Sequence, residues 1–163
     1  MRWLYSTGLR LAEIIAAKCE DLEQVDYRTD DGALATGWLL SVTGKGSRSR
    51  QVPVPAELVE ELGDELARHG LERQVGAASN KSIHVLARFN NDAKQPACWS
   101  ASGLYKAIKA FLASAAKGLD EASAGQLKKA STHWLRHCIP HPTMSSTQCT
   151  APLRAVSIRV LRP

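Results

Sequence analysis

The sequence has little tyrosine, and all of it comes early. Tyr5, Tyr27 and Tyr105 are the three tyrosines in 163 residues, so the last third of the chain contains no phenol nucleophile. No apolar run approaches the length of a membrane-spanning helix. The first ten residues, MRWLYSTGLR, are too short and too polar for a signal peptide. We therefore expect a cytoplasmic protein without a membrane partner.

Cysteine is also scarce, with four residues that follow no pairing pattern. We expect them to be reduced thiols. A metal site is the alternative for the late cluster of Cys138, His137, His141 and Cys149. Its spacing fits no zinc pattern, and prolines flank His141 on both sides, so we predict no metal.

The bulk composition is that of one ordinary globular domain, with 44% hydrophobic and 23% charged residues. The formal net charge is +5 and the isoelectric point is about 9.2. This basic balance favours a polyanionic partner, although many basic proteins bind no nucleic acid.

The hydrophobic pattern and the turn residues predict an α+β fold that is mostly helical, with a small antiparallel sheet. A Thr-Gly break separates an initial helical segment from the next helix. Leu58, Leu62 and Leu66 recur every four residues between a proline and Gly70, and Ser100 or Ser102 is placed to cap a later helix. The expected helices cover about 8–18, 55–69, 100–117 and a short segment from 131 or 132, and the expected strands cover 23–28, 37–43 and 50–54, with 71–98 irregular and polar and 119–130 helix or linker.

Three short motifs carry cations that suit a phosphate. Arg10 follows a Thr-Gly-Leu break at a helix start, and its planar fork can bind two phosphate oxygens. Lys45 lies between two glycines at an expected hairpin tip, with Arg48 and Arg50 just after it. Each also has an ordinary interpretation: Arg10 as a surface partner of Glu13, and the tip as a solubilising edge hairpin.

The third motif is the stretch THWLRHC at residues 132–138. His133 and Arg136 are three residues apart, so they share one face of a helix. Histidine can donate a proton near neutral pH, and arginine neutralises charge that builds on phosphoryl oxygens. For this motif alone, a capped helix with a packed histidine is the better interpretation.

Taken together and in this order, the three motifs resemble the tyrosine recombinase (phage integrase) family. The first motif resembles the family's TGLR-x-x-E box at residues 7–13, the second its GKG turn with basic residues and Val-Pro at 44–53, and the third its H-x-L-R-H box at 133–137. The resemblance covers residues 1–138, which we expect to be part of the family's catalytic domain.

The resemblance implies a chemistry without metal or nucleotide cofactor, acting on double-stranded DNA. In it, Arg10 and Arg136 clamp the scissile phosphate, and His133 assists proton transfer. Lys45 acts as general acid on the leaving 5′-hydroxyl. Supporting roles fall to Glu13, which buttresses Arg10, and to His137, which orders the helix, while Arg48 and Arg50 contact DNA.

The chain also departs from the family pattern. The family places its tyrosine nucleophile on a late helix, and none follows Cys138 here. We also expect this chain to lack the family's N-terminal clamp domain, because the resemblance begins at its first residues. We expect a catalytic domain truncated at both ends, with residues 139–163 an aberrant, disordered tail. Such a chain should not cleave DNA. The alternatives are a non-catalytic DNA-binding fragment, which acts alone or beside other recombinase protomers, and a pseudogene product without function.

Overall fold

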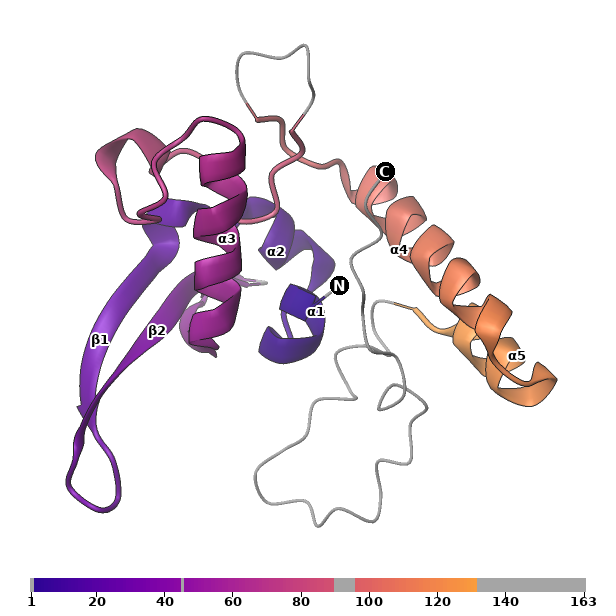
Figure 1. Ribbon diagram of the computed structural model, residues 1–163, viewed down its shortest axis with the longest axis horizontal. Helices are drawn as coiled ribbons and strands as arrows, with labels where there is room; N and C mark the ends of the chain where they lie inside the picture. The colour runs from indigo at the N-terminus through magenta and orange to yellow at the C-terminus, as the bar shows by residue number, and fades with distance from the viewer. Residues whose placement is uncertain (1, 45, 90–95, 132–163) are drawn as a thin grey trace.

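The computed structural model describes residues 2–44, 46–89 and 96–131 (Figure 1). These residues form helices together with one three-stranded antiparallel sheet of order β1-β2-β3, which is compatible with the expected α+β class. The α-helices are α1 (Arg2–Thr7), α2 (Leu11–Ala16), α3 (Ala56–Arg68), α4 (Ala101–Ala115) and α5 (Glu121–Lys129), and the strands are β1 (Leu22–Arg28), β2 (Leu34–Thr43) and β3 (Ser49–Val54).

The first two helices are separated by the Thr-Gly break that the sequence indicated. Gly8 has a left-handed φ of 62° and donates its N–H to the Leu4 carbonyl at 3.1 Å, which ends α1. The second helix is shorter than the expected 8–18. It ends at Ala16 because the Ala17 carbonyl accepts the N–H of Val85, at 2.9 Å, instead of continuing the helix.

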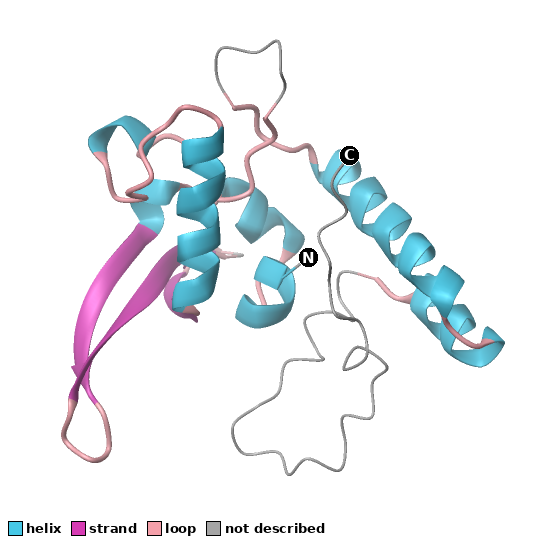
Figure 2. Ribbon diagram, viewed as in Figure 1, coloured by secondary structure: helices cyan, strands magenta, loops and turns pink. Residues whose placement is uncertain are grey.

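The sheet is built from two consecutive antiparallel hairpins. β2 pairs with β1 from Leu22↔Leu40 to Arg28↔Leu34, and with β3 from Trp38↔Val54 to Thr43↔Ser49. β2 begins at Leu34, three residues before the expected start, because the end of β1 pairs with it. Figure 2 shows the β1–β2 hairpin projecting away from the helices.

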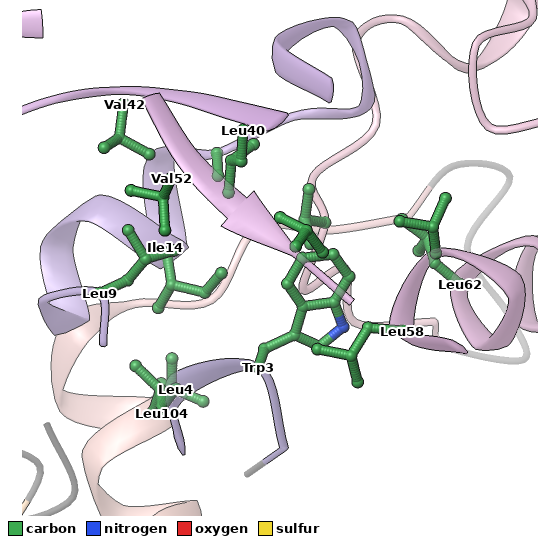
Figure 3. Close-up of a cluster of buried hydrophobic side chains, with 14 of the residues drawn as sticks. Trp3, Leu4, Leu9, Ile14, Leu40, Val42, Val52, Leu58, Leu62 and Leu104 are labelled. Carbon is green, nitrogen blue, oxygen red and sulfur yellow. The ribbon is translucent and has the colours of Figure 1, made fainter. Parts of the chain in front are cut away.

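One face of the sheet forms part of the core, and α3 packs against β2. α3 begins after Pro55, as expected, and it ends before Gly70, whose φ is +76°. The leucines spaced every four residues along α3 are all buried, as a core-facing stripe requires. Figure 3 shows residues of this cluster, which include Trp3, Leu9, Ile14, Leu40, Val42, Val52, Leu58 and Leu62.

The segment that follows α3 is irregular, as expected, but the expectation that it is polar is wrong in part. Val75, Ile83 and Val85 are buried in the core. Asn80 is fully buried, and its Nδ2 donates to the carbonyls of Glu72 at 2.7 Å and Gln74 at 3.0 Å. This amide adds to the backbone hydrogen bonds of the segment, in which Gln74 also accepts the Ala77 N–H at 3.0 Å.

The last described elements are the paired helices α4 and α5 (Figure 1). Ser100, one of the two expected caps, accepts the N–H of Gly103 at 3.0 Å. The sequence allows either helix or linker over residues 119–130, and the structure shows that 121–129 are helical. Lys109 of α4 donates to the carbonyls of Lys128 and Ala130, the latter at 3.0 Å, and so caps the end of α5.

Candidate nucleic-acid interface

Arg10 lies between α1 and α2, in extended conformation with φ −70° and ψ 153°. Leu9 beside it is buried in the core, and Thr7 is buried with its hydroxyl bonded to the Trp3 carbonyl. These neighbours fix the backbone of Arg10, while its side chain remains 53% exposed. The first motif therefore presents a guanidinium to solvent from an anchored backbone.

Glu13 is the buried partner of this arginine, with a side chain only 3% exposed. Its carboxylate accepts the backbone N–H of Arg10 at 2.8 Å and the Arg10 Nη1 at 2.9 Å. The first of these contacts is the reach-back bond of a helix capping box. Burial by itself raises the pKa of Glu13, but the hydrogen bonds from Arg10 and the charges of Arg50 and Arg10 outweigh it, so the pKa is lowered.

Arg50 reaches the same carboxylate from β3. Its Nη2 lies 2.9 Å from Glu13 Oε2, and its Nη1 lies 3.4 Å from Glu13 Oε1. In the structure both terminal nitrogens of Arg50 face Glu13, and the side chain is 37% exposed; the expected contact of Arg50 with DNA stays a prediction. The sequence missed this contact because Arg50 and Glu13 are far apart in the chain, and only the β2–β3 register brings them together.

Gly44, at the end of β2, lies against the same group. A Cβ atom at this position would stand 3.3 Å from Glu13 Oε1 and 3.8 Å from Arg10 Nη1. The absence of a side chain thus lets the hairpin end approach the ion pairs. Gly44 also donates its N–H to the Arg48 carbonyl at 2.9 Å. Gly46 and Ser47, just before β3, have left-handed φ values of 77° and 56°, which are typical of turn residues.

We call Arg10, Glu13 and Arg50 the shared-carboxylate cluster. Two guanidiniums around one carboxylate leave a formal charge of +1, with the exposed Arg48 nearby in the chain. In a cluster with a net positive charge, the half-exposed Arg10 can donate to a phosphate oxygen through the N–H groups that Glu13 does not occupy.

The other expected site residues, namely Lys45, His133, Arg136 and His137, lie outside the described residues. Of the two glycines that flank Lys45 in the sequence, Gly44 lies next to the shared-carboxylate cluster, whereas a Cβ atom on Gly46 would meet no atom within 4 Å. The capped end of α5 lies only a few residues before the third motif. The alternative metal cluster around Cys138 and the expected tail at 139–163 also lie outside the described residues.

The described residues contain neither a metal-binding cluster nor a membrane-spanning helix. In residues 2–44, 46–89 and 96–131, no group of three or more His, Cys, Asp or Glu side chains is placed to hold a metal ion. Over the same part of the chain, none of the helices has the length and apolar character needed to cross a bilayer.

Comparison with curated proteins finds similarity to one described as "Putative integrase/recombinase y4rD" of Sinorhizobium fredii (strain NBRC 101917 / NGR234). The two sequences are 28% identical over 152 residues, which is 90% of this chain and 44% of that protein. The chain therefore spans less than half the length of this relative. No family model matches the chain, and no solved structure matches it. The similarity extends over nearly the whole chain, and it supports a relationship to integrases and recombinases in general.

Proposed function

We propose that this chain is part of a tyrosine recombinase catalytic domain that binds the phosphate backbone of double-stranded DNA. The observation that carries the proposal is the contact of the first motif with the second. Gly44, the residue directly before Lys45 in the sequence, lies against Glu13 and the exposed Arg10 guanidinium. The family chemistry requires an arginine and a lysine from these two motifs at one phosphate.

In this proposal Arg10 and Arg136 neutralise the non-bridging oxygens of one phosphate, and His133 donates a hydrogen bond to it. Lys45 protonates the leaving 5′-hydroxyl in a complete enzyme. Glu13 buttresses Arg10, and its buried hydrogen bonds to the backbone and side chain of Arg10 support that role.

The tyrosine nucleophile of the family has no counterpart after Tyr105 in this sequence. Positioning and charge neutralisation do not replace a missing nucleophile. We therefore propose that this chain, by itself, occupies DNA without cleaving it. A chain of this kind acts as a DNA-binding fragment, alone or beside intact protomers of a related recombinase.

The test is binding of fluorescein-labelled duplexes of two unrelated sequences, followed by anisotropy over a range of salt concentrations. Three phosphate contacts, from Arg10, Lys45 and Arg136, give a log–log slope of about −2.7, at about −0.9 per phosphate. Arg136→Ala should reduce the magnitude of that slope by about one contact. Absence of binding to either duplex at low salt contradicts the proposal and favours a product without function.

A nicked suicide duplex tests the second half of the proposal. On such a duplex, an enzyme that attacks through a tyrosine stays trapped as a covalent protein–DNA complex, because the short cleaved fragment diffuses away and cannot be rejoined. We expect binding of this duplex without a covalent complex on denaturing gels. A complex that forms with this chain alone would overturn the proposed lack of cleavage.

A further inference from the structure

The shared-carboxylate cluster contains one more cation than the pairing of Arg10 with Glu13 needs. Glu13 Oε1 accepts Arg10 Nη1 at 2.9 Å, while its Oε2 accepts Arg50 Nη2, also at 2.9 Å. Because the carboxylate is almost fully buried, it cannot exchange either partner for water at low cost. The charge at this place is therefore set by how many guanidiniums share the carboxylate.

We propose that Arg50 is a positioning residue that keeps Arg10 available to a phosphate, by pairing with the Glu13 carboxylate and leaving the cluster positively charged. This inference rests on the proposed phosphate-binding function of Arg10. Without Arg50, Glu13 and Arg10 form a neutral pair, and an incoming phosphate meets the Glu13 charge at close range. With Arg50 present, the phosphate meets a net positive charge.

The geometry separates this role from direct phosphate contact by Arg50. Both terminal nitrogens of Arg50 lie within 3.4 Å of the Glu13 carboxylate, whereas for Arg10 only Nη1 and the backbone N–H are bonded to it. The side chain of Arg50 is also less exposed, at 37% against 53% for Arg10. Arg10 is thus the arginine that is free to bind, and Arg50 acts through Glu13.

The test titrates the ¹⁵N-labelled full chain with inorganic phosphate and follows the arginine Nε–Hε signals by NMR. The Arg10 signal is assigned by its loss in Arg10→Lys. In Arg50→Met, which keeps the aliphatic stem, the dissociation constant at Arg10 should rise about fivefold to tenfold from the loss of one nearby charge. In Arg50→Lys, which keeps the charge, it should stay within about twofold of the unsubstituted chain.

Second-site rescue is the decisive arm. Arg50→Met combined with Glu13→Gln removes one charge of each sign, so phosphate affinity should return to within about twofold of the unsubstituted chain. A purely structural role for Arg50 predicts that the double variant is no better than Arg50→Met. Arg28→Ala is the matched control for loss of a positive charge, because Arg28 lies far from the cluster. Arg28 pairs with Leu34 of β2, whereas Arg50 pairs with Val42, and these two β2 residues are eight positions, or about 26 Å, apart.

The outcomes are distinct. A double variant as weak as Arg50→Met overturns the proposal, as does an Arg50→Lys variant as weak as Arg50→Met or an Arg10 signal that phosphate does not move in the unsubstituted chain. If the double variant does not fold, the comparison of Arg50→Lys with Arg50→Met decides. Failure of the proposed function is seen separately, as a chain whose Arg10 binds phosphate in the predicted pattern but which binds no duplex DNA.

Discussion

Replacement of Glu13 by alanine should destabilise the fold more than any other loss of a single carboxylate among the described ion pairs. The Glu13 carboxylate accepts one backbone N–H and three guanidinium contacts, and its side chain is 3% exposed. Loss of a capping bond costs about 1 kcal/mol, and loss of a charge-assisted bond costs about 1.5–3 kcal/mol. Arg10 and Arg50 are partly exposed, so water replaces some of these contacts. We therefore expect a total loss of about 2–3 kcal/mol.

Urea denaturation followed by far-ultraviolet circular dichroism measures this loss. With a slope of about 1.5 kcal/mol per molar, the midpoint should fall by about 1.3–2 M urea. Glu20→Ala is the matched control, because Glu20 forms an exposed pair with Lys18 at 3.2 Å, and its loss should cost about 0.5 kcal/mol or less. If Glu13→Ala shifts the midpoint no more than Glu20→Ala does, the cluster does not hold the two motifs together.

Three further outcomes are expected. Because the folded-state pKa of Glu13 lies below its ordinary value of 4.5, the stabilisation by its carboxylate is present above about pH 4.5 and is lost as the pH falls through the lowered pKa. The difference in unfolding free energy between the unsubstituted chain and Glu13→Gln should therefore be constant from about pH 7 to 5 and shrink at lower pH. Asn80→Ala removes the side-chain donor of the Glu72 carbonyl and one of the two donors of the Gln74 carbonyl, which also accepts the Ala77 N–H. It should cost about 1–2 kcal/mol in the same urea assay, whereas replacement of the exposed Ser79 by alanine should cost about 0.5 kcal/mol or less. Burial raises the pKa of Cys19 to about 11, so iodoacetamide at about pH 8 should alkylate the exposed Cys98 and leave Cys19 unmodified. Peptide mass mapping measures both sites, and equal alkylation of the two cysteines in the folded chain would contradict the burial of Cys19.

Local signals in the sequence predicted much of the fold. The leucine spacing in α3, its Pro55 start and Gly70 end, and the Ser100 cap each depend on residues within a few positions of one another. Such features can be predicted from the sequence because helix caps and periodic apolar faces depend only on residues that are close together in the chain. The end of α2 was not readable in this way, because it depends on a hydrogen bond from Val85 to Ala17, which are far apart in the chain.

In the candidate site, too, the contacts between residues close in sequence were predictable, and those between distant residues were not. The pairing of Arg10 with Glu13 follows from their separation by three residues, and it was foreseen as an ordinary surface pair. The attachment of Arg50 to the same carboxylate requires the register of β2 with β3, and the approach of Gly44 requires that hairpin to pack on α2. The one sequence signal for that approach was the glycine, Gly44, directly before Lys45, the lysine with the predicted catalytic role.

The measurement that tests the central claim most directly is the salt dependence of duplex DNA binding by Arg10→Ala beside that of Arg28→Ala. Each variant removes one positive charge, but only Arg10 belongs to the shared-carboxylate cluster. We predict that Arg10→Ala weakens binding and reduces the magnitude of the log–log slope by about 0.9, while Arg28→Ala leaves the slope unchanged. Equal slopes for Arg10→Ala and the unsubstituted chain would contradict the account, because Arg10 would then contact no phosphate.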